Sequence, residues 1–334
     1  MTTPLQPFTL APVLVDRPWG GTRLARYGKD IGGSDRVAES WELADLPAHV
    51  VPAVDDPNTR IASGRHCGLS LRELIALNGD ALLGPIPPTS EGRFPLLVKL
   101  LDARENLSVQ VHPPAAYVAD HPEARLKTES WYVVEAEPGS ALFLDVEPGV
   151  TLEEIADRMG SGAIVPLLRR VDAVAGDFWH LPAGLVHALG AGTIVAEVQT
   201  PSDTTYRMYD WSREYARQPR ELHADASLES IRLDLPEHHV NAGRSPKTAR
   251  TLIDNDHYRI VEHQTEGGEP VVGSTPGPAV LLVISGTVRL GDLTLTAGST
   301  AVVPHECGEV SLRAEGEATI LEVSLALDEH ERLG

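Results

Sequence analysis

The sequence predicts a mainly β protein that folds as two units and contains a few short helices. Short apolar runs recur about every ten residues in the C-terminal third, a spacing typical of strands joined by tight turns. The 26 prolines and 29 glycines are spread along the chain, as expected where many turns are needed. A chain of 334 residues also exceeds the size that one hydrophobic core usually supports, and this favours two domains.

The most informative segment runs from Gly176 to His187 and has the spacing Gly-x5-Pro-x-Gly-x2-His. It predicts a strand, a tight Pro-x-Gly turn and a histidine at the start of the next strand. This spacing resembles the second sequence motif of the cupin superfamily, whose fold is a double-sheet jelly roll. The resemblance implies that the two units are cupin-type jelly-roll barrels.

The first two thirds of the chain combine predicted strands with three predicted helices. A helix over residues 70–83 is indicated by helically spaced leucines and by a capping box in which Ser70 pairs with Glu73. A second capping box begins the helix over residues 151–159, and a third helix is expected over residues 221–231. The predicted strands of this part are residues 40–43, 49–54, 96–101, 107–112, 130–134, 141–145 and 193–198.

Four side chains are candidates for one metal centre. Gln110 and His112 lie two positions apart in a predicted strand, so they point to the same face. With His187 and with Glu129 from a neighbouring strand, they make a set of two imidazoles, one amide and one carboxylate. Such a mixed nitrogen and oxygen set is compatible with zinc or another first-row divalent ion. The alternatives are a solvated strand edge for Gln110 and Glu129 and a structural role for His187.

The candidate linker between the two units is the polar, turn-forming stretch over residues 236–246. We expect a catalytic, metal-binding cupin domain over residues 1–238 and a C-terminal jelly roll over residues 239–334. The second unit repeats the Gly-x5-Pro spacing, beginning at Gly298, but no histidine follows at the matching position, so it is predicted to lack a metal site. Its predicted strands are residues 257–262, 279–284, 287–290, 300–303 and 319–323.

Seven further segments are informative when taken together in chain order: Trp19-Gly20-Gly21, Glu39-Ser40-Trp41-Glu42 and residues 96–103, 107–113, 127–129, 182–189 and 202–211. In this collinear order they resemble the type I phosphomannose isomerases (mannose-6-phosphate isomerases), in their short bacterial form. The resemblance implies one zinc ion per chain, with Gln110, His112, Glu129 and His187 as its ligands, and it implies that Arg207 is a catalytic or substrate-positioning cation.

The resemblance also implies an activity, the interconversion of mannose 6-phosphate and fructose 6-phosphate. Such an aldose–ketose isomerisation moves a proton between adjacent carbons through an enediol and needs no redox cofactor. A divalent ion can polarise the carbonyl or orient the sugar, and a base must collect the carbon-bound proton. Glu197 is the candidate base, because it lies in an apolar strand where desolvation raises the pKa of a carboxyl. The alternative is a structural partner of an arginine.

Lysine is scarce in this chain, which makes the position of each one informative. Lys99 interrupts an apolar strand, where an ammonium is costly unless it is paired or faces a polar cavity. Lys127 lies two residues before Glu129 and shares its face in an extended segment. We expect Lys127 to be catalytic and Lys99 to bind the sugar phosphate, with plain ion pairs as the alternative. Ser108 and Trp19 are further expected substrate-binding residues, with core packing as the alternative for Ser108.

Two other functions remain open. A non-haem iron cupin oxygenase uses a triad of two histidines and one carboxylate, but the fourth candidate ligand Gln110 and the nearby cations disfavour it. A non-catalytic sugar-binding cupin is disfavoured because the ligand set is intact.

The composition restricts partners and location. The net charge of −20 argues against nucleic acid, whose phosphates require clustered Lys and Arg. No apolar run approaches the roughly 20 residues that span a bilayer, and the proline-broken N-terminus is a poor signal peptide. Cys67 and Cys307 form no metal or redox pattern, so two unpaired thiols are the simpler prediction and a disulfide the alternative. We expect a cytoplasmic protein that acts on a small sugar phosphate and binds neither nucleic acid nor membranes. The oligomeric state is not indicated.

Overall fold

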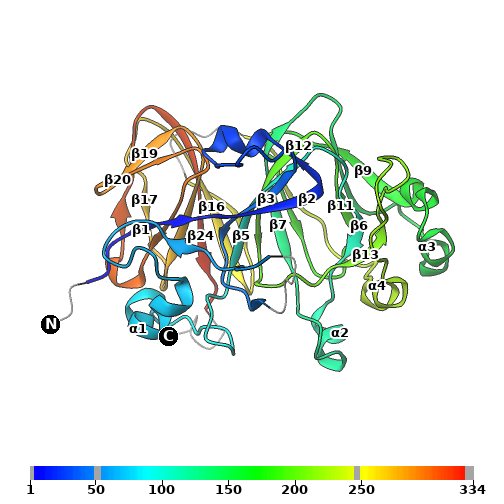
Figure 1. Cartoon of the computed structure of the whole chain (residues 1–334), viewed down its shortest axis with the longest axis horizontal. Helices are drawn as coiled ribbons and strands as arrows, with labels where there is room; N and C mark the ends of the chain where they lie inside the picture. Colours follow the sequence, from blue (N-terminus) through cyan, green and yellow to red (C-terminus); the bar gives the residue numbers. More distant parts are fainter. Residues whose placement is uncertain (1–3, 49–53, 244–248, 328–334) are drawn as a thin grey trace.

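The computed structural model describes residues 4–48, 54–243 and 249–327. Two β-barrels lie side by side, with the C-terminal strands in one and most of the N-terminal two thirds in the other (Figure 1). The prediction of a mainly β chain with a few short helices is confirmed. Among the described residues, no helix is both long enough and apolar enough to cross a membrane.

The N-terminal barrel consists of two facing sheets. The seven-stranded sheet contains, in spatial order, β14 (His238–Val240), β10 (Phe178–Leu181), β7 (Glu129–Ala136), β12 (Thr193–Gln199), β5 (Leu97–Ala103), β3 (Val37–Leu43) and β2 (Val13–Gly21). The five-stranded sheet contains β13 (Tyr206–Tyr209), β6 (Val109–Val111), β11 (His187–Leu189), β8 (Ala141–Val146) and β9 (Leu168–Asp172).

The C-terminal barrel is built on a second seven-stranded sheet, which two smaller sheets face. The large sheet contains β15 (Arg250–Asp254), β16 (Tyr258–Glu266), β24 (Glu317–Leu325), β18 (Ala279–Ser285), β21 (Thr300–Val303), β1 (Phe8–Ala11) and β4 (Arg60–Ile61). The small sheets contain β20 (Leu293–Thr296), β19 (Thr287–Leu290) and β23 (Arg313–Ala314), and β17 (Val271–Val272) with β22 (Val310–Ser311).

Two N-terminal strands complete the C-terminal sheet. In strand β1, Phe8 pairs with Val302 of β21, and β4 pairs with the other side of β1. The predicted linker contains strand β14, which pairs with β10 of the first barrel. The division at residue 238 therefore cuts through a strand that belongs to the first barrel. That division stays a prediction.

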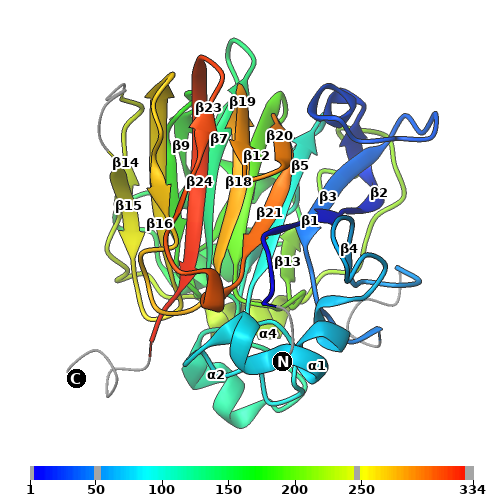
Figure 2. The same ribbon diagram turned by 90° about the vertical axis from the view of Figure 1, so that its left-hand side faces the viewer.

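The helices lie mainly at one end of the barrels (Figure 2). The helices α1 (Leu71–Leu83) and α3 (Leu152–Arg158) each begin with the predicted capping box. The helix predicted over residues 221–231 is shorter, because α4 spans Ala224–Ser230. The short helix α2 (Ala115–Asp120) was not predicted, since a single turn and a half gives no clear period.

Most predicted strands are present, with shifted ends. The strand predicted over residues 107–112 is reduced to β6, because Leu107 and His112 lie outside the ladder. The strand predicted over residues 49–54 falls almost wholly outside the described residues. Both cysteines are free thiols, which confirms the simpler prediction for them.

Strand β5 is buried on both faces, as its apolar run predicts. Val98 and Leu100 pack into the core between the two barrels, whereas Leu101 and Ala103 pack inside the N-terminal barrel. Because side chains alternate along a strand, Lys99 points to the interior of the N-terminal barrel. The alternation of β5 therefore places a cation inside the barrel that holds the candidate ligands.

Candidate metal centre

Strands from both sheets of the N-terminal barrel bring the four predicted ligands together. Gln110 lies on β6 and His112 directly follows that strand, while Glu129 begins β7 and His187 begins β11. Strand β11 pairs with β6 so that His187 lies opposite Gln110. Strand β7 belongs to the facing sheet, so the candidate centre lies between the two sheets.

The Pro-x-Gly turn before His187 needs its glycine. Gly184 has a φ of 96°, a left-handed conformation that favours glycine, and a Cβ atom there would lie 2.6 Å from Cγ of Arg232. The amide of Gly184 donates to the carbonyl of His112 at 2.9 Å. The turn therefore fixes His187 and His112 relative to each other.

The candidate ligand atoms of His112, Glu129 and His187 all lie within 4.8 Å of one another. The Nε2 atoms of the two histidines each lie 3.3 Å from a carboxylate oxygen of Glu129, and Nε2 of Gln110 lies 3.2 Å from that of His187. His112, Glu129 and His187 are buried, yet Nε2 of His112 and Oε1 of Glu129 have no hydrogen-bond partner among the described residues. Buried polar atoms are costly to leave unpaired, so these atoms fit a bound cation better than an ordinary protein interior.

Backbone carbonyls orient both imidazoles. The Nδ1–H of His112 donates to the carbonyl of Thr204 at 3.0 Å, and that of His187 donates to the carbonyl of Leu185 at 2.9 Å. This tautomer, assigned from those partners, leaves each Nε2 with a lone pair rather than a proton, as a metal ligand requires. Burial, with a contribution from Lys127, lowers the pKa of His112 to about 3, so its ring is neutral at neutral pH.

Glu129 supplies the negative charge of the centre. Burial by itself raises the pKa of this carboxyl, but Lys127 and His112 outweigh that effect and hold the pKa well below its usual value. The ammonium of Lys127 lies 3.0 Å from the carboxylate. Two imidazoles, one amide and one carboxylate suit a divalent first-row ion such as zinc. The residues present therefore fit the metal that the sequence predicts.

A cavity of about 270 Å³ adjoins this centre, and Gln110 and Lys127 lie at the junction. All of the predicted catalytic and substrate-binding residues line the cavity, and so does the predicted ligand Gln110. The lining comprises Asp16, Arg17, Pro18, Trp19, Glu39, Lys99, Leu101, Leu107, Ser108, Gln110, Lys127, Trp131, Glu197, Asp203, Thr205, Arg207 and Arg220. The hydroxyl of Ser108 donates to Oε1 of Gln110 at 3.1 Å, which helps to orient that amide.

Five cations line the cavity, and four of them are paired with carboxylates. Arg207 has no carboxylate within ion-pair distance among the described residues, and its Nε atom is buried without a hydrogen-bond partner. Burial lowers the pKa of its guanidinium, and the nearby Arg220 lowers it further. The backbone amide of Arg207 donates to Nδ1 of His223 at 3.1 Å. Arg207 is therefore held as an uncompensated cation, which suits an anionic ligand.

A buried lysine joins two carboxylates on the opposite wall of the cavity. The Nζ atom of Lys99 lies 3.3 Å from Glu197 and 3.5 Å from Glu39. Burial raises the pKa of Glu39, but Lys99 and Arg17 outweigh it, so the pKa falls to about 2. In Glu197, burial and the charge of Glu129 together raise the pKa above its usual value. The partners of Glu197 are Lys99 and the indole N–H of Trp131 at 2.9 Å, rather than an arginine.

Comparisons with known proteins identify the family. The model of the type I phosphomannose isomerase catalytic domain matches residues 8–136. A relative, the mannose-6-phosphate isomerase ManA of Bacillus subtilis (strain 168), is 34% identical over 96% of this chain and 99% of its own. This chain belongs to the type I phosphomannose isomerases. The mannose-6-phosphate isomerase of Streptococcus mutans is 31% identical over 90% of this chain and 93% of its own.

Solved structures of phosphomannose isomerases share the fold of this chain. The crystal structure of the mannose 6-phosphate isomerase from Bacillus subtilis superposes with a TM-score of 0.82 at 28% identity, covering 96% of this chain and all of that one. A zinc-bound mannose 6-phosphate isomerase superposes with a TM-score of 0.75 at 17% identity, covering 97% of this chain. The predicted resemblance to this family and its cupin-type fold are confirmed.

In this phosphomannose isomerase, sequence reasoning missed several residues of the cavity. Arg17, Glu39 and Arg220 line it, and His223 supports Arg207, yet none of them has a spacing that points to the metal centre. The register of β2 against β3 shifts between Asp16 and Gly21, so the strand period does not reveal where Arg17 points. The one available signal was Glu39, which belongs to a segment that matches the family.

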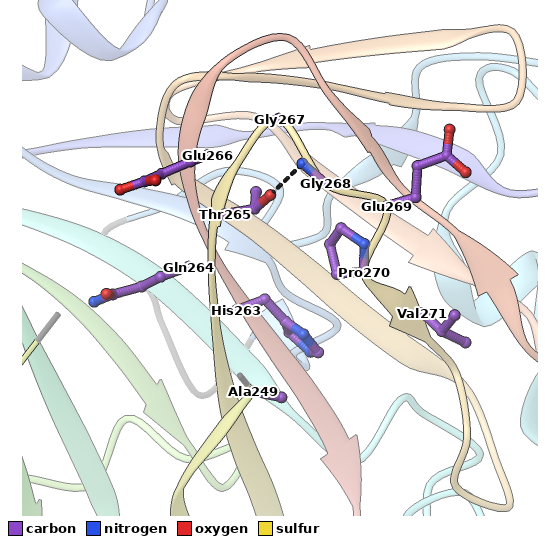
Figure 3. A pocket seen from close by; sticks show the side chains of 10 residues that line it. All are labelled: Ala249, His263, Gln264, Thr265, Glu266, Gly267, Gly268, Glu269, Pro270 and Val271. Carbon is purple, nitrogen blue, oxygen red and sulfur yellow. Dashed lines mark hydrogen bonds between the residues drawn. The ribbon is translucent and has the colours of Figure 1, made fainter. Parts of the chain in front are cut away.

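A larger cavity, of about 580 Å³, lies in the C-terminal barrel (Figure 3). Among the described residues, no Lys or Arg lines it, whereas Glu266 and Glu269 do. His263, which also lines this cavity, makes a hydrogen bond of 2.7 Å from Nε2 to the carboxylate of Glu322. An acidic lining disfavours a phosphorylated ligand. The smaller cavity, which is lined by cations, is therefore the better candidate for the functional site.

Proposed function

We propose that this chain interconverts mannose 6-phosphate and fructose 6-phosphate, with one zinc ion per chain held by Gln110, His112, Glu129 and His187. The observation that carries the proposal is the convergence of buried, unpaired ligand atoms beside a cavity with an uncompensated arginine. The relatives named mannose-6-phosphate isomerase support the substrate. The zinc-bound relative supports the metal.

The cavity residues divide the tasks of binding and proton transfer. When bound, zinc would polarise the sugar carbonyl or orient the sugar. Arg207 binds the phosphate and orients the chain of the sugar, because it is the cavity cation for which the described residues provide no carboxylate partner. Ser108 and Trp19 lie on the same lining and make further contacts with the sugar.

Glu197 transfers the proton in this proposal. Its ionised carboxylate takes a proton from one carbon of the sugar and returns it to the neighbouring carbon, while the hydroxyl proton passes from one oxygen to the other, so no electrons leave the substrate. Lys127, beside the centre, stabilises the oxygen that becomes negative in the enediol intermediate. Lys99 lines the cavity as a further cation for the sugar phosphate, and it holds the carboxylate of Glu197 in the cavity wall, where the substrate can reach it.

In this proposal, the N-terminal barrel performs all of these tasks. Residues 1–238 form the catalytic, metal-binding cupin domain, and residues 239–334 form a jelly roll that lacks a metal site. The N-terminal strands β1 and β4, which pair with the C-terminal sheet, tie the two domains together.

The test is coupled turnover of mannose 6-phosphate, compared with free mannose, together with elemental analysis of the purified protein. We expect zinc in about equal amount to protein, turnover of the phosphorylated sugar, loss of turnover with a chelator and recovery with zinc. A protein that contains iron and consumes oxygen would instead support a cupin oxygenase. Zinc-loaded protein that binds the sugar phosphate without converting it would support a non-catalytic binding role.

A further inference from the structure

The loop that follows β12 serves the metal centre and the cavity at once. Its residue Thr204 provides the carbonyl that accepts from Nδ1 of His112 at 3.0 Å. Its residues Asp203 and Thr205 line the cavity. The position of this loop therefore determines which way the Nε2 atom of His112 points.

Gln199, the last residue of β12, holds this loop in place through hydrogen bonds from its side chain. The side chain is completely buried, and its Nε2 donates to the carbonyls of Thr200 at 2.8 Å and of Ser202 at 2.6 Å. Its Oε1 is buried without a hydrogen-bond partner among the described residues. Burying an amide whose acceptor is unpaired is unfavourable. The two hydrogen bonds that Nε2 of Gln199 donates to the loop offset this cost.

Further hydrogen bonds hold the same loop in place. The hydroxyl of Ser202 accepts from the amide of Thr204 and donates to the carbonyl of Arg125, both at 3.2 Å. The amide of Arg125 donates to the hydroxyl of Thr204, also at 3.2 Å. With Gln199 in place, the backbone around Thr204 is held at several points, and its carbonyl has a fixed direction.

We propose that Gln199 is a positioning residue of the metal centre, which acts through the loop over residues 200–204 to fix the Thr204 carbonyl against His112. Residues that orient the ligands of a metal commonly affect its affinity although they do not touch it. Gln199 pairs with Glu129 in the ladder between β12 and β7, so it stands beside the centre without being one of the four proposed ligands. This inference rests on the proposed zinc site.

The test uses Gln199→Met, which keeps the length of the side chain and removes both donors. We expect zinc affinity, measured by competition with a chelator, to fall about 10- to 100-fold. The matched control is Thr193→Val at the other end of β12, where the hydroxyl donates to the carbonyl of Gly190 at 2.7 Å and is equally buried. The control removes a buried bond of the same kind, and its zinc affinity should equal that of the wild type.

A second variant, Ser202→Ala, keeps the proposal testable where Gln199→Met fails to fold. It loosens the same loop, so zinc affinity should fall in the same direction. Wild-type affinity in Ser202→Ala and in folded Gln199→Met, or an equal loss in Thr193→Val, would overturn the inference.

The His112→Ala variant separates this inference from the proposed function. Zinc binding that is lost in His112→Ala but unchanged in Gln199→Met overturns the role of Gln199 alone. A wild-type protein that binds no zinc overturns the proposed centre and the role of Gln199 with it.

Discussion

Lys99 and Glu197 face each other on the neighbouring strands β5 and β12, and a carboxylate oxygen of Glu197 lies 3.3 Å from the ammonium of Lys99. A third residue, Glu39, lies 3.5 Å from the same ammonium. A lysine in an apolar strand is tolerated because these two buried carboxylates surround it. Burial and the charge of Glu129 nevertheless leave Glu197 with a raised pKa beside the cavity, although Lys99 acts to lower it.

The Lys99→Met variant should be strongly destabilised, because it leaves two buried carboxylates without their shared cation. We expect the free energy of unfolding to fall by about 3 kcal/mol or more in denaturant titrations. Arg26 provides the control, since its ion pair with Glu135 is largely exposed and Arg26→Met should lose no more than about 1 kcal/mol. Equal small losses in both variants would show that the Lys99 pairs do not stabilise the fold.

The His187→Ala variant should lose both zinc and turnover while it stays folded. The imidazole is one of the two proposed nitrogen ligands, and the packing of the second barrel does not depend on it. Elemental analysis and turnover of mannose 6-phosphate test this, with His263→Gln in the C-terminal barrel as the control that keeps its zinc. Full activity in metal-depleted His187→Ala protein would contradict the assignment of the centre.

The Arg207→Ala variant should keep its zinc and lose turnover. Because Arg207 is the cavity cation without a carboxylate partner in the described part of the chain, we expect kcat/KM to fall by about a hundredfold or more. Inorganic phosphate, which should compete with substrate in the wild type, should compete more weakly in the variant. A variant that mainly loses zinc would instead place Arg207 in the support of the metal.

The stability of the zinc-free protein should fall as the pH is lowered from 7 to 5. His112 has an ordinary pKa of 6.5, but burial lowers it to about 3 in the folded protein. Between these values the unfolded state binds more protons, so the free energy of unfolding decreases with falling pH, by up to about 1.4 kcal/mol per pH unit from this group. The pKa of Glu129 is also lowered, so its contribution has the same sign and is lost only at lower pH.

Denaturant titrations of the zinc-free protein at pH 7 and pH 5 measure this dependence. The His112→Gln variant is the comparison, because it removes this imidazole and leaves every other histidine in place. A smaller decrease in the variant is expected, and an identical decrease would mean that His112 is not the titrating group.

The sequence reveals the local features of this protein better than its long-range ones. Ser70 with Glu73 identified a helix start, and the spacing around His187 pointed to a residue of the candidate metal centre, because each signal lies within a short segment. The pairing of Phe8 with Val302 joins the two ends of the chain, and no local pattern contains it. Arg17 lies two residues from Trp19, yet only the folded barrel brings it to the cavity.

Glu197→Gln should separate proton transfer from metal binding. The amide keeps the shape of the side chain and can still contact Trp131, but it cannot accept a proton from carbon, so kcat should fall about a hundredfold to ten-thousandfold. Zinc content should stay at the wild-type level, since Glu197 is not among the ligand atoms of the centre. In the wild type, turnover should decrease as the pH falls through the raised pKa of Glu197, because the base must be ionised. A Glu197→Gln protein with wild-type kcat would assign the proton transfer to another group of the cavity.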